Sequence, residues 1–399
     1  MATPISTSAA AAVGAAVKKV AKSVTTASPE PAFQPRQTFE VSESITRSYY
    51  LGHHHAALNR MQKMLSNVGL IIECRDFRVP LSSWNPLLER QLATSTAERA
   101  RIIVYTKRDL AVPNGGRFAR GQQNPAEVVR KLKEFHRKKG DAKDVLFTGG
   151  ESKDGGAMLQ QLLGTIKQVA REANILTGLR AMVVGMPNAG KSTLLNKLRA
   201  KGMNLGKAAK TGAEPGVTRK LGTPVRIVPR ETDTDPSLTG MGEGVFLVDT
   251  PGVFMPYVSS AEDMLKLSLA GSVKDGIISN VTVADYLLYR VNLVDPRCYR
   301  QYCERPTNDV YRFLGNVARK TGKLAKFKEP NIEAAADWVI QEWRRGRLAR
   351  FLLDRVDDET MGRAVDAARE PTTSLSQARK ALKVERKEKR MEKRSAAQS

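Results

Sequence analysis

The chain has 399 residues and a formal net charge of +24, from 65 lysines and arginines against 41 aspartates and glutamates. The length predicts more than one domain, and the charge favours a polyanionic partner, either nucleic acid or an anionic membrane surface. Three cysteines exclude a disulfide framework and are typical of a reducing compartment. The longest small apolar run, residues 9–17, is too short to span a bilayer, which excludes an integral membrane transporter.

The first 29 residues are rich in alanine, serine and threonine and contain no acidic residue. On a helix, their three lysines would gather on one side and the alanines and valines on the other, as in a mitochondrial transit peptide. A disordered terminus without a targeting role is the alternative interpretation. We expect residues 1–37 to form a transit peptide and linker, which predicts a location in the mitochondrial matrix.

Short apolar runs predict buried strands at residues 69–74, 101–105, 144–147 and 180–184. Helical stretches precede or separate them, at residues 60–68, 125–138 and 158–173. Strands alternating with helices of this length predict a parallel, doubly wound sheet with helices on both faces. Phosphate sites in such sheets lie beyond the carboxyl ends of the strands.

After Gly252 the apolar periodicity turns helical. It predicts helices at residues 261–269, 283–291, 308–321 and 332–345. We expect an α/β domain over residues 38–275 and a small all-α domain over residues 276–370. Residues 371–399 carry nine basic and three acidic side chains, which predicts either a polyanion-binding tail or a solvated helix.

Residues 185–193 read Gly-Met-Pro-Asn-Ala-Gly-Lys-Ser-Thr and follow the fourth predicted strand directly. This is the pattern of a P-loop, whose backbone N–H groups wrap the phosphates of a nucleotide. Lys191 would reach the terminal phosphates, and the hydroxyl of Ser192 would bind Mg²⁺. The predicted nucleotide contacts in this loop are Asn188, Ala189, Gly190, Lys191, Ser192 and Thr193.

Residues 245–252 form an apolar strand that ends in Asp-Thr-Pro-Gly. The carboxylate of Asp249 would hold Mg²⁺ through water, and the N–H of Gly252 would contact a γ-phosphate. Between this motif and the P-loop, Thr218 lies in a glycine-flanked loop at residues 215–219. It would join the magnesium shell when the γ-phosphate is present, so the predicted Mg²⁺ ligands are Ser192, Thr218 and Asp249.

A third group of residues favours guanine over adenine. Asp109 follows the second predicted strand, and its carboxylate would accept both the N1–H and the exocyclic amine of guanine. The stem of Lys107 would lie over the base. Thr148 and Gly149 follow the third predicted strand, where backbone N–H groups would meet the guanine O6.

The order of these motifs is unusual, because Asp109 precedes Lys191, whereas ordinary small GTPases have the P-loop first. A circular permutation keeps the site intact while it moves the chain termini. The sequence therefore predicts an α/β fold, a circularly permuted P-loop GTPase with a doubly wound, mostly parallel sheet, followed by a small all-α domain. The chain would pass from Gly252 directly into the helical domain.

The motif order, the P-loop and the Asp-Thr-Pro-Gly segment are joined by Asp-Phe-Arg-Val-Pro at residues 76–80, Asn85-Pro86 and Gly52-His53. Together they resemble the YlqF/RbgA family of circularly permuted ribosome-assembly GTPases. The transit-like leader is similar to that of its mitochondrial branch. The resemblance covers residues 49–353 and implies binding of GTP, GDP and Mg²⁺, with GTP hydrolysis on the large ribosomal subunit during its maturation.

Val253 follows the Asp-Thr-Pro-Gly motif at the place where a Ras-like GTPase has a glutamine that orients the attacking water. Because valine cannot orient water, we expect slow intrinsic turnover. The resemblance implies His53 as the catalytic group that orients the water, and the adjacent His54 and His55 leave that choice open. It also implies that Asn188 binds K⁺, which would take the role of an arginine finger.

Two positions depart from the family pattern. Thr106 stands where the family usually has an asparagine that braces the base-reading loop, and it is counted among the nucleotide-binding positions. Residues 148–150, Thr-Gly-Gly, replace the usual Ser-Ala-Lys-like segment. We expect guanine affinity to be reduced, while the discriminating carboxylate of Asp109 remains.

Residues 1–37 contribute +3 and residues 371–399 contribute +6 to the net charge, which leaves +15 on residues 38–370. Basic segments at residues 130–139 and 344–350 lie in both predicted domains, as contact with rRNA requires. Binding through many phosphates should weaken steeply with salt.

The leading hypothesis is a GTP-hydrolysing assembly factor for the large subunit of the mitochondrial ribosome. It would dock on rRNA and ribosomal proteins of the subunit precursor in the GTP state, and hydrolysis would release it. We expect a monomer when free, in the matrix or peripherally on the inner membrane. The alternative is an rRNA-binding structural factor, or a mitoribosome-associated protein, that uses GTP as a ligand with little turnover. A GTPase acting on tRNA or in membrane signalling would need an accessory domain or lipid anchor that the sequence does not indicate.

Overall fold

A computed structural model of the chain describes residues 33–42, 45, 52–93, 99–113, 122–149, 153–209, 222–232, 235–255, 257–258, 260–369, 380 and 391. Pro35–Ser399 forms one compact unit, distinct from Met1–Gln34. The predicted loop at residues 215–219 lies outside the described residues, as do nearly all of the predicted transit peptide and basic tail.

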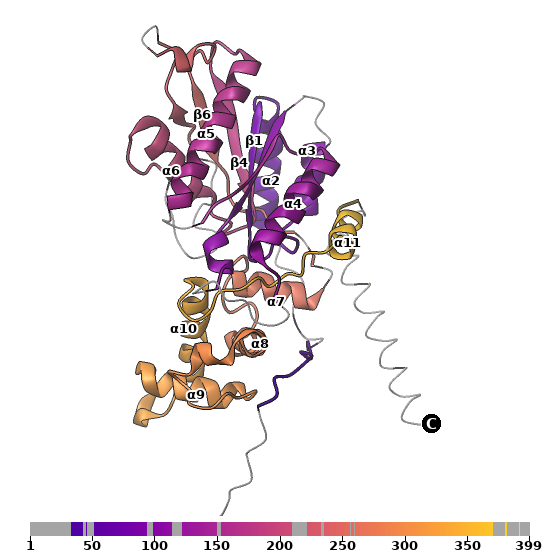
Figure 1. Ribbon diagram of the computed structural model, residues 1–399, viewed down its shortest axis with the longest axis vertical. Coiled ribbons are helices and arrows are strands. Elements are labelled where there is room, and N and C mark those ends of the chain that lie inside the picture. Colours follow the sequence, from indigo (N-terminus) through magenta and orange to yellow (C-terminus); the bar gives the residue numbers. More distant parts are fainter. Residues whose placement is uncertain are drawn as a thin grey trace, which may run out of the picture. The chain divides into compact units, whose positions relative to one another are not determined.

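The centre of the structure is a single sheet (Figure 1). Its strands are β1 (Leu70–Asp76), β2 (Ala100–Thr106), β3 (Asp144–Phe147), β4 (Leu179–Gly185), β5 (Val225–Val228) and β6 (Val245–Asp249). They lie in the order β3-β2-β1-β4-β6-β5, all parallel except β5, which pairs antiparallel with β6. The predicted α/β fold with a doubly wound, mostly parallel sheet is confirmed, and β5 was not predicted.

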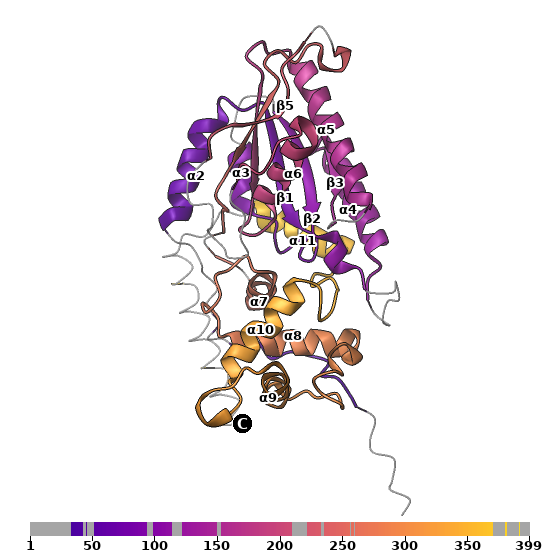
Figure 2. The same ribbon diagram turned by 90° about the vertical axis from the view of Figure 1, so that its left-hand side faces the viewer.

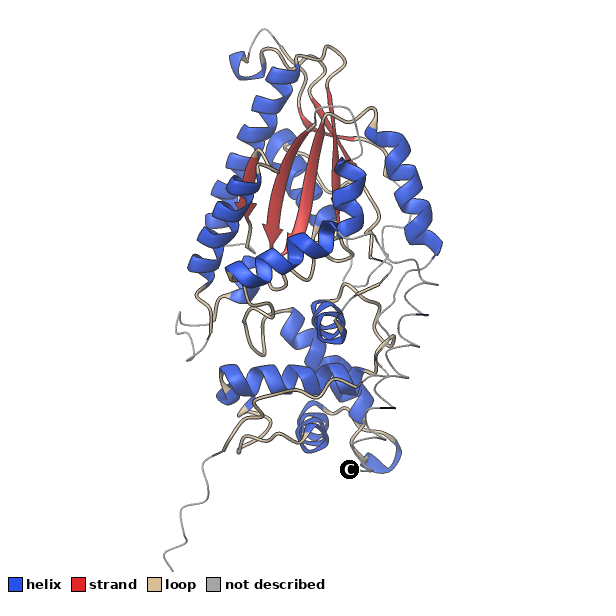
Figure 3. Cartoon of the chain, turned by 90° about the vertical axis from the view of Figure 1, so that its right-hand side faces the viewer, coloured by secondary structure: helices blue, strands red, loops and turns tan. Residues whose placement is uncertain are grey.

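Helices cover both faces of the sheet (Figure 3). They are α2 (Gly52–Leu65), α3 (Pro86–Ala93), α4 (Pro125–Lys139), α5 (Lys153–Ala173) and α6 (Lys191–Met203). Because successive strand residues point to opposite faces, Leu70 and Ile72 pack with α5 and α6, whereas Ile71 packs with α2 and α3. This two-sided burial explains why all seven residues of β1 are buried.

The predicted helix at residues 60–68 differs from the structure, since α2 begins at Gly52 and ends at Leu65. Helix α3 was not predicted, because eight residues with a mixed charge pattern give little periodicity. Helix α4 matches its prediction, and its ends have clear physical causes. The side chain of Asn124 accepts a hydrogen bond from the N–H of Ala126, and Gly140 ends the helix in a left-handed conformation.

The second half of the chain is helical, with α7 (Ala261–Ala270), α8 (Asn280–Val294), α9 (Val310–Thr321), α10 (Ile332–Arg344) and α11 (Asp358–Arg369). Short 3₁₀ turns are η1 (Arg108–Ala111), η2 (Pro236–Leu238), η3 (Pro296–Tyr299) and η4 (Lys326–Lys328). Helices α7 to α10 lie together (Figure 2) and share one apolar cluster that includes Leu265, Leu287, Leu314 and Trp343. The four helices predicted here are therefore present.

That apolar cluster also contains Val79, Met186 and Phe254, which follow strands of the sheet. Helix α11, which the sequence did not predict, packs against α3, and its Met361 joins the apolar cluster of α4. The chain thus returns to the α/β part after α10. The domain boundaries at residues 275 and 370 remain predictions. Among the residues described, no helix has the length and apolar character that crossing a membrane requires.

Candidate functional site

The carboxyl ends of the parallel strands bring the predicted motifs together. Strand β4 runs into the P-loop, β6 ends at Asp249, and β1 and β2 end at Asp76 and Thr106. The segment after β3 begins with Thr148. Because these strands are parallel neighbours, all of these ends lie at one edge of the sheet.

The P-loop connects β4 to α6 in a tight turn. A Cβ atom on Gly185 (φ 143°) would lie 2.3 Å from the carbonyl oxygen of Cys74, so only glycine permits this approach to β1. Gly190 (φ 87°) and Asn188 (φ 57°) are also left-handed. Helix α6 begins at Lys191, so its first-turn N–H groups, which lack partners within the helix, form the kind of site that binds phosphate.

Lys191 is 6% exposed, and its ammonium group donates hydrogen bonds to the carbonyl oxygens of Met186 (2.8 Å) and Gly185 (3.3 Å). Burial lowers the pKa of this lysine, and the charge of Asp249 opposes that effect. The side chain is therefore held inside the loop, beside the predicted position of the terminal phosphates.

The hydroxyl of Ser192 donates to Oδ2 of Asp249 at 2.6 Å. Asp249 is buried at the end of β6, and its neighbour Thr250 is fixed by a 2.7 Å hydrogen bond to the carbonyl oxygen of Val183. A hydroxyl and a carboxylate so close together provide the hard oxygen ligands that Mg²⁺ prefers, so these two residues fit the ion. Thr218, the third predicted ligand, lies outside the described residues.

Two loops meet where guanine is predicted to bind. The N–H of Arg108 donates to the carbonyl oxygen of Thr148 (2.9 Å), and the N–H of Thr148 donates to that of Tyr105 (2.8 Å). A Cβ atom on Gly149 would lie 3.2 Å from Cβ of Asp109, so the glycine stands directly beside the carboxylate side chain. The predicted base-reading residues Asp109, Thr148 and Gly149 are thus neighbours.

Thr106 and Lys107 connect this base-reading region to the P-loop. The Thr106 hydroxyl is close to two carbonyl oxygens, those of Ala189 (2.9 Å) and Arg75 (3.2 Å). The Lys107 ammonium donates to Asn188 O (2.6 Å) and to Oδ2 of Asp76 (3.0 Å). Burial lowers the pKa of Lys107, while Asp76 opposes this shift. In this structure the tip of Lys107 braces the P-loop, a role that the sequence did not predict.

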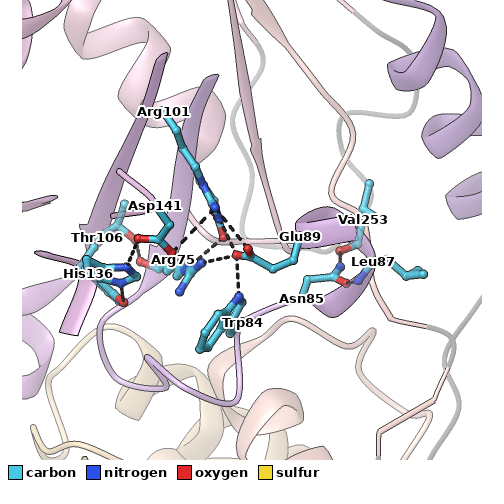
Figure 4. Close-up of polar contacts among 12 residues, drawn as sticks. Arg75, Trp84, Asn85, Leu87, Glu89, Arg101, Thr106, His136, Asp141 and Val253 are labelled. Atoms are coloured by element: carbon cyan, nitrogen blue, oxygen red, sulfur yellow. Dashed lines mark hydrogen bonds and ion pairs between the residues drawn. The ribbon is translucent and has the colours of Figure 1, made fainter. Parts of the chain in front are cut away.

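Gly252 and Val253 lie against the P-loop. A Cβ atom on Gly252 would lie 2.5 Å from Cα of Pro187. The N–H of Val253 donates to the carbonyl oxygen of Gly185 (3.2 Å), and its own carbonyl accepts from Nδ2 of Asn85 (2.8 Å; Figure 4). The Val253 side chain is buried in the apolar cluster of α2 and α3. Asn85 therefore fixes the segment that follows Asp-Thr-Pro-Gly.

The last carbonyl groups of α7 are bound by side chains from three other segments. Nδ2 of Asn188 donates to Gly271 O (2.7 Å), and Nη2 of Arg78 donates to Ala270 O (3.2 Å). Arg344 of α10 donates to the carbonyl oxygens of Ser268 (2.7 Å) and Leu269 (3.0 Å). The carbonyl groups at the end of a helix lack partners within it, so these contacts join α7 to the P-loop and to α10. The sequence did not predict this junction.

A buried charge cluster underlies the same region (Figure 4). Glu73 binds Arg75 (2.7 Å) and Arg101, and Arg75 reaches Glu89 of α3 (3.0 Å). Burial alone would raise the pKa of Glu73, but Arg101 and Arg75 outweigh it and lower this pKa to about 2. The only sequence signal was a charged residue inside an apolar run.

The predicted catalytic residue His53 falls in the first turn of α2, together with His54 and His55. The side chains of these histidines lie outside the described part of the chain. Their role, and the choice among them, therefore remains a prediction.

Comparison with known proteins gives the family. A family model described as a 50S ribosome-binding GTPase matches residues 180–313. Mitochondrial GTPase 1 of Schizosaccharomyces pombe is 37% identical over 82% of this chain and 94% of its own length. The chain belongs to the mitochondrial branch of the YlqF/RbgA family of GTPases.

Further relatives of this GTPase have the same range of similarity. Mitochondrial ribosome-associated GTPase 1 of Xenopus tropicalis is 31% identical over 80% of this chain and 98% of its own length. Among solved structures, GNP-bound YlqF from T. maritima is 21% identical over 74% of this chain and 97% of that chain, with a TM-score of 0.45.

Membership of this family makes the chain a GTP-hydrolysing enzyme that binds GTP and GDP, usually with Mg²⁺. The names of the relatives also support a mitochondrial location. The predicted recognition of the family and the predicted GTPase activity are confirmed.

Proposed function

We propose that this GTPase assists the assembly of the large subunit of the mitochondrial ribosome. It docks on rRNA and ribosomal proteins of the subunit precursor in the GTP state, and hydrolysis releases it. The observation that carries this proposal is the hydrogen bond from Asn188 of the P-loop to Gly271 at the end of α7. This contact links the nucleotide site to the helical region, so that the nucleotide can alter a surface outside the site.

Two further observations support a ribosomal partner. Relatives are named mitochondrial ribosome-associated GTPase 1, and the matching family model is described as a 50S ribosome-binding GTPase. The excess of +15 on residues 38–370 provides the cationic surface that phosphate contacts require. A GTPase that acts only on small molecules has no use for such a charge.

The residues of the site divide the work on the nucleotide. The Lys191 ammonium leaves the carbonyl oxygens of Gly185 and Met186 to bind the terminal phosphates. Ser192 and Asp249 hold Mg²⁺, with Thr218 as the ligand that depends on the γ-phosphate. When bound, Mg²⁺ neutralises charge on the phosphate oxygens. Asp109 selects guanine, and Thr148 and Gly149 offer backbone N–H groups to its O6.

Hydrolysis requires a group that positions water, because the side chain of Val253 is apolar and buried. We assign this role to His53, with His54 and His55 as alternatives. K⁺ held with the help of Asn188 supplies the positive charge that an arginine finger gives in other GTPases. Turnover is therefore slow until the ribosomal partner completes the site.

The coupling runs through the end of α7. Asn188 uses its side chain on Gly271 and its backbone carbonyl on Lys107, so a nucleotide or ion that moves this residue disturbs both contacts. Arg78 holds the adjacent Ala270 carbonyl, and its guanidinium lies 4.7 Å from the ring centre of Trp343 in α10. A change at the P-loop thereby reaches two helices of the helical region.

The remaining parts of the proposal concern location and state. Residues 1–37 direct the chain to the mitochondrial matrix as a transit peptide, and the basic residues 371–399 add contacts to rRNA. The protein is a monomer when free. Peripheral association with the inner membrane is compatible with its positive charge.

Cosedimentation with ribosomal particles tests the proposal. The full chain is mixed with mitochondrial large-subunit precursors in a non-hydrolysable GTP analogue or in GDP, and pellets are analysed for the protein. We expect it in the pellet with the analogue and in the supernatant with GDP. Equal binding in both nucleotides, or none in either, would contradict the proposed switch.

A further inference from the structure

The loop between α9 and α10 presents an aromatic side chain to solvent. Phe327 is 95% exposed and stands in the middle of η4. The loop is closed below it as a hairpin, with Leu324 bridged to Pro330. The N–H of Ala325 donates to Glu329 O (2.8 Å), and the N–H of Asn331 donates to Lys323 O (2.9 Å). The phenyl ring is therefore held at the tip of an ordered hairpin.

The backbone at this tip is strained. Phe327 and Lys328 both have a φ of 63°, a left-handed conformation that is unfavourable for residues other than glycine. Both ends of the hairpin are anchored, because Gly322 ends α9 and the side chain of Asn331 accepts from the N–H of Ala334 in α10. Strain that is maintained in this way is typical of binding sites.

Positive charge surrounds the exposed ring. Lys326 and Lys328 flank Phe327 directly, and Lys320 and Lys323 precede it, against one carboxylate, that of Glu329. An aromatic ring between cationic side chains is the arrangement that binds single-stranded nucleic acid. The bases stack on the ring, and the lysines contact the phosphates.

We propose that this hairpin, residues 322–331, binds an unpaired segment of rRNA, with one base stacked on Phe327 and the backbone phosphates held by Lys326 and Lys328. The inference rests on the proposed function and names the chemistry of its docking surface. Single-stranded RNA is favoured over a lipid surface because a membrane anchor needs a broad apolar face, whereas lysines stand on both sides of this ring.

Fluorescence anisotropy with the full chain tests the stacking contact. The probes are a labelled unstructured oligouridine RNA and a labelled RNA duplex. Phe327→Ala should weaken binding to the single strand about 5- to 150-fold, the effect of losing one base–aromatic stack, and leave duplex binding unchanged. Phe327→Tyr should restore it. Leu176→Ala removes an apolar side chain that is 85% exposed in the α/β part and serves as the matched control.

The lysines are tested separately by salt dependence. The double variant Lys326→Ala/Lys328→Ala should bind less tightly at low salt and flatten the plot of log affinity against log salt by about one unit. Wild-type affinity in Phe327→Ala, or an unchanged salt slope in the lysine variant, would overturn the RNA assignment. Intrinsic GTP turnover should be the same in all of these variants, because the hairpin is not part of the nucleotide site.

Two controls separate this inference from the proposed function. If the wild-type chain fails to pellet with ribosomal particles in either nucleotide, the proposed function fails. If the wild type pellets and Phe327→Ala pellets equally well, only the hairpin proposal fails. Binding of the wild type to anionic phospholipid vesicles that Phe327→Ala abolishes, without any effect on RNA, would assign the hairpin to a membrane instead.

Discussion

Nδ2 of Asn188 lies 2.7 Å from the carbonyl oxygen of Gly271 and donates a hydrogen bond to it across 83 residues of sequence. Asn188→Ala should therefore lower the free energy of unfolding by about 1 kcal/mol. Asn188→Asp should cost more, because a carboxylate would face a carbonyl at the negative end of α7. Denaturant unfolding of the three proteins measures both effects. An aspartate variant as stable as the wild type would argue against this contact.

Lys191→Ala should abolish GTP binding. The ammonium is the buried cation of the P-loop, and its loss should weaken affinity by roughly a hundredfold or more, since each 1.4 kcal/mol corresponds to a factor of ten. Titration with a fluorescent GTP analogue measures the affinity. Lys197→Ala, on the same helix but outside the P-loop, is the control and should bind normally.

Asp109→Asn should shift the preference of the site from guanine toward xanthine nucleotides. The amide offers a donor where the carboxylate accepted, and xanthine presents an acceptor at that position. Competition binding of GTP and XTP measures the preference. Asp144→Asn is the control, because Asp144 begins β3 at the other edge of the sheet. An unchanged preference for GTP in Asp109→Asn would refute the base-reading role.

The buried cluster around Glu73 should make stability depend on acid. Its folded pKa of about 2 lies below its ordinary value of 4.5, so its contribution is fully present above pH 4.5 and is lost as the pH falls toward 2. At neutral pH this contribution is on the order of 3 kcal/mol, from 1.36 kcal/mol per pKa unit.

Glu73→Gln should lower stability at pH 7 and flatten the pH dependence of the unfolding free energy in that acid range. Urea unfolding at several pH values measures the slope. Glu127→Gln alters an exposed carboxylate of α4 and should change little. A Glu73→Gln slope equal to that of the wild type would show that the Glu73 carboxylate does not carry the effect.

Asn85→Ala should reduce GTP turnover without a matching loss of GTP affinity. Asn85 holds the carbonyl of Val253, and its Oδ1 accepts from the N–H of Leu87 at the start of α3, but it does not contact the P-loop lysine. Releasing this segment should misplace the Asp-Thr-Pro-Gly loop. Single-turnover hydrolysis and equilibrium binding, measured side by side, separate the two effects. A loss confined to affinity would contradict this positioning role.

The sequence was informative where a local pattern determines structure. The P-loop and strands β1 to β4 and β6 were predicted to within two residues, because apolar runs and glycine spacing are properties of short segments. Strand β5 was missed because four residues at a sheet edge give no clear period. Helix α11 was missed because its surface is largely polar and one buried residue, Met361, anchors it.

Long-range contacts could not be predicted in the same way. The partner of Glu73 is Arg101, and that pairing follows from the parallel register of β1 and β2 rather than from either segment alone. The end of α7 depends on Asn188, Arg78 and Arg344, which come from three distant parts of the chain. The sequence indicated Asn188 and Arg78 as motif residues but gave no sign that they meet one helix.

Phosphate release is the most direct test of a GTPase that is completed by its ribosomal partner. The rate is measured for the full chain alone and with large-subunit precursors, in K⁺ and in Na⁺. We predict slow intrinsic turnover that the precursors accelerate by an order of magnitude or more, and faster hydrolysis in K⁺ than in Na⁺. Turnover that stays slow with the precursors in both salts would contradict this account and favour an rRNA-binding factor that keeps GTP as a structural ligand.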